Sequence, residues 1–130
     1  MNADIVITEF LDSEAAGFLD QSFAVFRDDQ LAFDPERLRQ QVKDARALIV
    51  RNRTQVDKAL LDAAPKLSVI GRLGVGLDNI DTAACAQRDI KVIPAHGANS
   101  DSVAEYAITA ILVMMRPVWQ VSQTMRDGGF

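Results

Sequence analysis

LIVRNRTQVDKALLDAAPKLSVIGRLGVGLDNID, residues 48–81, contains one complete strand–helix–strand unit, and this unit decides the fold class. Residues 47–50 lack polar alternation, which is typical of a strand buried on both faces of a parallel sheet. Residues 57–64 are predicted to form a helix that Pro65 ends, because the residue before a proline avoids the helical conformation. A second strand, residues 67–71, leads into a loop rich in glycine. Two strands joined by a helix predict an α/β fold with right-handed crossovers.

The same alternation of strand and helix continues on both sides of this unit. Upstream, Ser13 is expected to cap one helix, and Asp34-Pro35 supplies a cap and a first-turn proline for the next. Downstream, Asp81 is expected to cap a short helix. Predicted strands cover residues 4–10, 23–27, 47–50, 67–71 and 91–93. We therefore expect a flavodoxin-like, doubly wound α/β fold with a parallel five-stranded sheet in the order 2-1-3-4-5.

Composition and charge exclude several classes of protein. A net charge of −4 without a basic block argues against nucleic-acid and anionic-membrane partners. The N-terminus lacks the basic and apolar regions of an export signal, and the apolar run 106–115 is about half as long as a membrane span. The single cysteine, Cys85, rules out an internal disulfide and is interpreted as a packing residue. We expect a cytoplasmic protein without membrane or nucleic-acid partners, and we assign no metal site.

Residues after position 98 have a different character. Residues 102–105 (SVAE) match a capping box, and the helix that follows is apolar nearly all round, which is typical of burial on every side. Pro117 is expected to end this helix and to begin another that stops at Gly128. A chain of 130 residues hardly buries such a helix without a second domain or a second subunit. The chain is therefore expected to be cut from a longer protein.

Ligands of open α/β sheets bind beyond the carboxyl ends of the strands. Arg51, Asn52 and Arg53 follow one predicted strand, and Arg72 follows the next, inside a loop of the form G-x-x-G-x-G. That spacing is the reverse of the dinucleotide fingerprint. Guanidinium groups bind carboxylates through two parallel hydrogen bonds, and glycines allow backbone amides to approach a ligand closely. These strand ends predict a site for a small anion.

Two other classes with this fold lack the residues that they require. A phospho-acceptor receiver needs an aspartate at the end of the third strand, where this chain has Arg51. A flavodoxin needs a phosphate-binding loop directly after the first strand, where this chain has the acidic run EFLDSE at residues 9–14. The sequence supports neither class.

The quoted run, together with HGANSDSVAEYAITAILVMMR (residues 96–116) and MRDGGF (residues 125–130), resembles the D-isomer-specific 2-hydroxyacid dehydrogenases. It is nearest to the branch that resembles 3-phosphoglycerate dehydrogenase. The resemblance covers residues 45–130 well and the earlier residues only in their strand–helix rhythm. It implies two lobes: residues 1–98 would be the substrate-binding (catalytic) domain, and residues 99–130 the hinge and the start of a truncated NAD-binding Rossmann domain.

The resemblance also implies which residues hold the ligands. The glycine loop would be a carboxylate cradle, with its backbone amides directed at the 2-oxo acid. The implied residues are Arg51, Asn52, Arg72, Gly74, Val75 and Gly76 for the substrate, and Val75 and Val103 for NAD or NADP.

The family's catalytic arginine, glutamate and histidine belong to the second lobe and have no counterpart in this chain. His96 stands where the family usually has proline, and we interpret it as structural or exposed, or alternatively as a substrate contact; Pro94 replaces a common asparagine. We expect the substrate-binding part of an oxidoreductase that transfers a hydride between NAD(P)H and a small 2-oxo acid, inactive by itself. A homodimer through the helix around 102–116 is expected. The alternative is a stand-alone module that binds a small carboxylate or another protein without catalysis.

Overall fold

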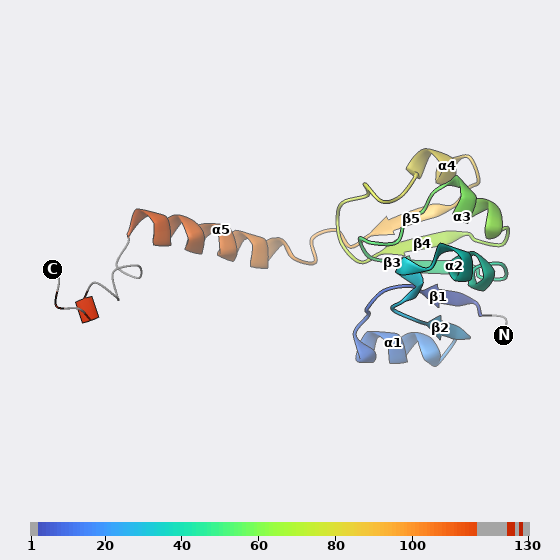
Figure 1. Ribbon diagram of the computed structural model, residues 1–130, viewed down its shortest axis with the longest axis horizontal. Helices are drawn as coiled ribbons and strands as arrows, with labels where there is room; N and C mark the ends of the chain where they lie inside the picture. The colour runs from blue at the N-terminus through green and yellow to red at the C-terminus, as the bar shows by residue number, and fades with distance from the viewer. Residues whose placement is uncertain (1–2, 117–124, 127, 129–130) are drawn as a thin grey trace. The chain divides into compact units, whose positions relative to one another are not determined.

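A computed structural model describes residues 3–116, 125, 126 and 128 of the chain (Figure 1). Its sheet has five parallel strands in the order β2-β1-β3-β4-β5, which confirms the predicted fold class and strand order. The strands are β1 (Ile5–Ile7), β2 (Val25–Arg27), β3 (Ala47–Val50), β4 (Val69–Arg72) and β5 (Lys91–Pro94). β1 is shorter than the predicted residues 4–10, because the chain leaves the ladder at Thr8 and Glu9, whose side chains bond to the loop after β3.

The helices that alternate with the strands begin at acidic caps. Asp34, Asp57 and Asp81 each accept a hydrogen bond from a backbone amide in the first turn, at 3.0, 2.8 and 2.8 Å respectively. Asp12 caps the first helix through the amide of Glu14 (2.9 Å), so the expectation that Ser13 is the cap was wrong. The helices are α1 (Ser13–Asp20), the 3-10 turn η1 (Leu31–Phe33), α2 (Pro35–Gln41), α3 (Lys58–Ala63), α4 (Thr82–Ala86) and α5 (Ser100–Met115).

The start of α5 differs from the predicted capping box. The helix begins at Ser100, so Ser102 lies inside its first turn, and Asn99 stands at the cap without a side-chain hydrogen bond. Gly97, at φ +74°, turns the chain out of the loop after β5, and Asp101 places a negative charge in the first turn, where the helix dipole favours it. The helix that was predicted to follow Pro117 lies outside the described residues.

The two faces of the sheet are covered unequally. The chain moves from β1 to β2 in one direction and then to β3, β4 and β5 in the other. With right-handed crossovers, this places α1 on one face and α2, α3 and α4 on the opposite face (Figure 1). Leu48, Val50 and Ile70 are fully buried in the larger core, whereas Ala47 and Ile49 on the α1 side are half-buried. The prediction that β3 is buried on both faces therefore holds on one face only, because α1 is the only helix of this unit on the other.

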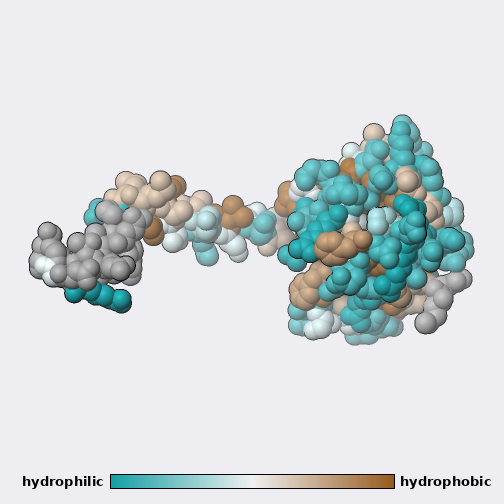
Figure 2. Space-filling view, in the orientation of Figure 1, coloured by the Kyte–Doolittle hydropathy of each residue, from teal (hydrophilic) through white to brown (hydrophobic). Residues whose placement is uncertain are grey.

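The chain divides into two compact units, one ending at His96 and the other beginning at Gly97. α5 belongs to the second unit, and no residue of this helix is buried. Figure 2 shows hydrophobic surface along this helix. Its exposed large hydrophobic residues include Ile111 and Met114. The burial that its apolar sequence predicts is thus absent from the described part of this chain. None of the described helices is both long and apolar enough to cross a membrane.

Candidate functional site

The register of the sheet brings the predicted anion-binding residues to one edge. Val50 of β3 is paired with Arg72 of β4, and Arg72 is paired with Pro94 of β5, so these three strands end level with one another. Arg51 follows Val50 directly and lies at the same carboxyl edge. On the other side, β1 pairs with β3 so that Glu9 falls opposite this strand end.

The carboxylate of Glu9 is the centre of a hydrogen-bond network that sequence reasoning missed. Its Oε1 accepts from the backbone amides of Arg51 (2.9 Å), Arg53 (3.2 Å) and Thr54 (3.0 Å) and from the Thr54 hydroxyl (2.9 Å). Its Oε2 accepts from the amides of Asn52 (3.3 Å) and Arg53 (3.1 Å). Four consecutive backbone amides therefore wrap around one carboxylate. We call residues 51–54 the arginine loop.

The surroundings of Glu9 keep it ionised. Its side chain is buried, and burial by itself raises the pKa of the carboxyl group. Hydrogen bonds from the backbone of Thr54, Arg51 and Arg53 and from the Thr54 hydroxyl outweigh burial, so the net effect lowers the pKa below its ordinary value. Thr8 supports the same place through a 2.7 Å hydrogen bond between its hydroxyl and that of Thr54.

Asn79 holds the arginine loop from the opposite side. Its buried side-chain amide donates to the carbonyl oxygens of Arg51 (3.2 Å) and Thr54 (2.8 Å). The backbone carbonyl of Asn79 accepts a hydrogen bond from the amide of Val56 at 2.8 Å. The loop is thus bound at its amides by Glu9 and at its carbonyls by Asn79, and the side chains of Arg51, Asn52 and Arg53 remain exposed.

Arg72 folds against the glycine loop that follows it. Gly74 has φ +151°, and a Cβ atom added there would overlap Nη1 of Arg72 and lie 2.8 Å from its Cζ. The Nε atom of Arg72 is buried and has no hydrogen-bond partner among the described residues. An acceptor supplied by a ligand would satisfy it, which is why this guanidinium is the strongest candidate for contact with an anion.

The same geometry tests whether the glycine loop suits a dinucleotide. The space that a side chain would fill at Gly74 is occupied by Arg72, and a Cβ atom at Gly76 would lie 2.8 Å from Oδ1 of Asp78. The amide of Gly74 donates to the Arg72 carbonyl at 2.9 Å. At both glycines the space is therefore occupied by the chain's own side chains, and Val75 between them is 45% exposed.

The arginines of this edge take part in none of the described ion pairs. The described ion pairs lie elsewhere and join Arg27 to Asp20, Arg37 to Asp28, Lys66 to Asp44 and Arg88 to Asp62. The Cζ atom of Arg53 lies 5.2 Å from the centre of the Phe33 ring, a distance suited to a cation–π contact. The charges of Arg51, Arg53 and Arg72 are therefore available to a ligand.

Two further predicted positions form none of the hydrogen bonds of this network. Val103 is 56% exposed and belongs to the second unit. His96 is exposed, and its backbone amide donates to the Pro94 carbonyl at 2.9 Å. Within the part of the chain that the structure describes, no cluster of histidine, cysteine, aspartate and glutamate side chains could hold a metal ion.

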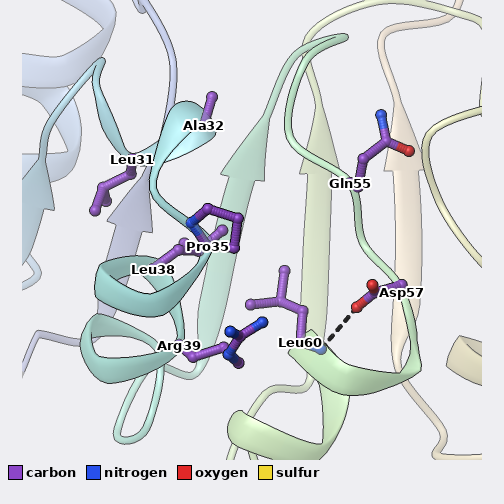
Figure 3. Close-up of a pocket in the computed structure, with 8 residues that line it drawn as sticks. All are labelled: Leu31, Ala32, Pro35, Leu38, Arg39, Gln55, Asp57 and Leu60. Carbon is purple, nitrogen blue, oxygen red and sulfur yellow. Dashed lines mark hydrogen bonds between the residues drawn. The ribbon is translucent and has the colours of Figure 1, made fainter.

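A cavity of about 270 Å³ opens between η1, α2 and the start of α3 (Figure 3). None of the predicted ligand-binding residues lines it, and the Asp57 carboxylate beside it is already bound to the Leu60 amide. Its walls are Leu31, Ala32, Pro35, Leu38, Arg39, Gln55, Asp57 and Leu60. The cavity is a gap between packed helices, separate from the candidate site.

The signal that could have identified Glu9 lies in its position, whereas Asn79 carries none. Glu9 ends the run IVITE, so it is an acidic residue at the carboxyl end of an apolar strand. A carboxylate in that place needs donors, and the neighbouring strand ends in four consecutive residues with free amides. Asn79 lies between the glycine loop and the Asp81 cap, and its sequence neighbourhood alone shows no partner.

Comparison with known proteins places this geometry in a family. The sequence model of a protein family, the catalytic domain of the D-isomer specific 2-hydroxyacid dehydrogenases, matches residues 5–127. The chain is 49% identical over 114 residues to (S)-sulfolactate dehydrogenase from Chromohalobacter salexigens, covering 88% of this chain and 37% of that protein.

Solved structures give the same result. The PH0520 protein from Pyrococcus horikoshii matches with a TM-score of 0.81 and 26% identity, over 98% of this chain and 38% of that one. NAD+-bound 3-phosphoglycerate dehydrogenase from Entamoeba histolytica matches with a TM-score of 0.67 and 26% identity, over 87% and 39% of the two chains. The chain thus spans well under half the length of these relatives. It belongs to the D-isomer-specific 2-hydroxyacid dehydrogenase family of oxidoreductases.

Proposed function

We propose that this chain is the substrate-binding part of an NAD(P)-dependent D-2-hydroxyacid dehydrogenase, which interconverts a 2-hydroxy acid and its 2-oxo acid. Residues 1–98 would be the substrate-binding domain, and residues 99–130 the hinge and the start of the NAD-binding domain. The observation that carries the proposal is the guanidinium of Arg72, whose Nε has no hydrogen-bond partner among the described residues and which folds against the glycine loop beside the fixed arginine loop. The length of the relatives, of which this chain covers 37–39%, supports the assignment to one part of a larger enzyme.

The substrate carboxylate is assigned to Arg72 and the glycine loop. The unpartnered Nε of Arg72 provides a charged donor. The amides of Val75 and Gly76 make no hydrogen bond within the described structure, whereas the Gly74 amide is engaged with the Arg72 carbonyl. The absence of a side chain at Gly74 therefore leaves room for the Arg72 guanidinium. The amides of Val75 and Gly76 complete the carboxylate site. Arg51 and Asn52 line the neighbouring side.

We further assign the substrate to acids with a second anionic group. The names of two relatives, sulfolactate dehydrogenase and 3-phosphoglycerate dehydrogenase, describe hydroxy acids that carry a sulfonate or a phosphate beside the carboxylate. Arg72 is assigned to the carboxylate, so the positive charges of Arg51 and Arg53 remain for a second anionic group. The contact with Phe33 keeps the Arg53 guanidinium in place while its edge remains free to donate.

Hydride transfer requires groups from beyond this chain. A bound nicotinamide would carry the hydride, and Val75 and Val103 are assigned as contacts to NAD or NADP from this side. The chain's only histidine, His96, has no carboxylate beside it in the described hydrogen bonds or ion pairs, so the acid–base group must come from the other lobe. The isolated chain binds the acid without turning it over. The apolar surface of α5 is assigned to a second copy of the chain, and the buried, reduced Cys85 suits the cytoplasm.

The activity is tested in the longer protein that carries this chain together with a nucleotide-binding lobe. Oxidation of NADH or NADPH is followed with pyruvate and with 3-sulfopyruvate, which differ only by the sulfonate. The proposal expects turnover with a lower KM for 3-sulfopyruvate, and Arg53→Ala should raise that KM while leaving the KM for pyruvate unchanged. Absence of turnover with either 2-oxo acid would remove the dehydrogenase assignment.

A further inference from the structure

We propose that Glu9 is a positioning residue: its carboxylate acts as a permanent internal anion that fixes the arginine loop and so aims Arg51 and Asn52 at the substrate. The inference rests on the function proposed above, because it assumes that these two side chains face the acid. Glu9 itself touches no ligand, since both of its oxygens are taken up by the loop.

The backbone of the arginine loop has the shape of an anion site. Consecutive amides that converge on one point form a concave surface that binds phosphates and carboxylates in other proteins. Here all four amides of residues 51–54 converge on Glu9. Because this surface is filled from within, a substrate anion has to use the side chains of the loop and the glycine loop next to it.

The two carboxylate oxygens of Glu9 accept hydrogen bonds from different sets of donors in the arginine loop. Oε1 bonds to the amides of Arg51, Arg53 and Thr54 and to the Thr54 hydroxyl, whereas Oε2 bonds to the amides of Asn52 and Arg53. Glutamine keeps one acceptor oxygen and places an NH2 group where the second oxygen was, so a donor would face the Asn52 amide. The Glu9→Gln variant therefore disturbs the loop at Asn52 and leaves its Thr54 end in place.

The burial of Glu9 explains why a carboxylate is required. The side chain is 6% exposed, so in the native chain the four amides depend on its carboxylate as their acceptor. Asn79 binds only carbonyl groups of the loop and offers no substitute. Removal of the carboxylate leaves the four amides without this acceptor and lets the loop change its conformation. A small displacement of Arg51 and Asn52 is then enough to weaken binding of the acid strongly.

The test uses the 130-residue chain with sulfolactate as the probe. Binding is measured by NMR titration, and the backbone amide signals of residues 51–54 report on the loop. Glu9→Ala should shift these four amides and weaken sulfolactate binding by about tenfold or more. Formate at high concentration can fill the vacated anion site. It should restore the amide signals and most of the affinity, measured against wild type in the same formate buffer, and sodium chloride at equal ionic strength should not.

Glu9→Gln provides a second test if Glu9→Ala folds poorly, because it keeps the size of the side chain. It should shift the Asn52 amide more than the Thr54 amide and show no response to formate. Asp44→Ala is the matched control: it removes a carboxylate that pairs with Lys66 ahead of the amino ends of β3 and β4, at the edge of the sheet opposite the loop, and it should leave sulfolactate binding unchanged. A role of Glu9 in stability alone would lower the unfolding midpoint of both variants without a formate-dependent recovery of affinity.

Two failures can be told apart. If wild type does not bind sulfolactate, the proposed function fails, and the amide signals of Glu9→Ala still decide whether Glu9 holds the loop. If wild type binds and Glu9→Ala binds equally well, or if formate restores the amide signals without the affinity, Glu9 does not position the binding side chains.

Discussion

Oε1 of Glu9 accepts hydrogen bonds from the backbone amide and the hydroxyl of Thr54, at 3.0 and 2.9 Å, across 45 residues of sequence. The pair joins the end of β1 to the loop that follows β3. It fixes the backbone from which Arg51 and Asn52 extend, and it places a buried negative charge behind an exposed positive edge. The candidate site is therefore built at the carboxyl ends of strands β1 and β3, which are brought together by their pairing in the parallel sheet.

Acid should destabilise the first unit through Glu9. Its pKa is lowered in the folded chain below the ordinary value of 4.5, so the stabilisation is present above that pH and is lost as pH falls through the folded-state pKa. The midpoint of urea unfolding should fall as pH is lowered from 5 to 3. In Glu9→Gln the midpoint of urea unfolding should be lower than that of wild type at pH 6, and it should fall less steeply than that of wild type below pH 5. Parallel curves for the two proteins would contradict this role.

Arg72 should be the largest single contributor to binding of the acid. Arg72→Ala removes the charged donor whose Nε lacks a partner, and it should weaken carboxylate binding by about 1.5–3 kcal/mol. Arg72→Lys should recover only part of this loss, because an ammonium cannot form two parallel bonds. Arg27→Ala is the control, since Arg27 forms an exposed ion pair with Asp20. Isothermal titration with sulfolactate measures all three, and an unchanged Kd for Arg72→Ala would remove it from the site.

A side chain at Gly74 should displace the Arg72 guanidinium and destabilise the loop. A Cβ atom at Gly74 collides with the guanidinium, and its φ of +151° is unfavourable for other residues, so Gly74→Ala should cost about 1–3 kcal/mol of stability. In the double variant with Arg72→Ala the collision disappears, and the combined loss should be smaller than the sum. Gly17→Ala is the matched control: nothing lies near a Cβ there, and the change should stabilise α1 by about 0.5–1 kcal/mol. Chemical unfolding of wild type, the two single variants, the double variant and Gly17→Ala tests this, and additive losses would argue against the contact.

Cys85 should react with thiol reagents only when the first unit opens. Its side chain is fully buried, and burial followed by the charge of Asp81 raises the pKa of the thiol, with Arg88 acting in the opposite direction. Thiolate is the reactive form, so both access and ionisation slow the reaction. The labelling rate with a disulfide reagent should rise with urea in step with unfolding. Rapid labelling of the native chain would show that the core around α4 is open.

Much of the fold could be predicted from local sequence. Asp34 and Asp81 were expected to cap helices and do so, since a cap depends on residues within one turn, and Asp57, expected as the first residue of its helix, stands at the cap instead. β3 occupies the predicted residues 47–50, because an apolar run between polar loops is a local signal. The errors at Ser13 and Ser102 have the same local origin: another residue nearby, Asp12 in one case and Asn99 in the other, stands at the cap position.

The part of the site that could not be predicted depends on strand order. Glu9 meets its partners only because β1 and β3 are neighbours in the sheet, and Asn79 meets them only because the chain after β4 returns beside β3. The side chain of Arg72 likewise shares space with Gly74 through its conformation rather than through a pattern of residue types. The arginines could be identified as an anion site from sequence, whereas the groups that hold them in place required coordinates.

The most direct test of the central claim compares lactate with sulfolactate as ligands of the 130-residue chain, because the two acids differ only by a sulfonate. Both acids should shift the amides of Val75 and Gly76 and the Nε–H signal of Arg72. Sulfolactate should bind more tightly by about tenfold or more and additionally shift Arg51 or Arg53. Equal affinities without a shift at Arg51 and Arg53 would contradict the second anion site, and no shift at Arg72 with either acid would contradict the carboxylate site itself.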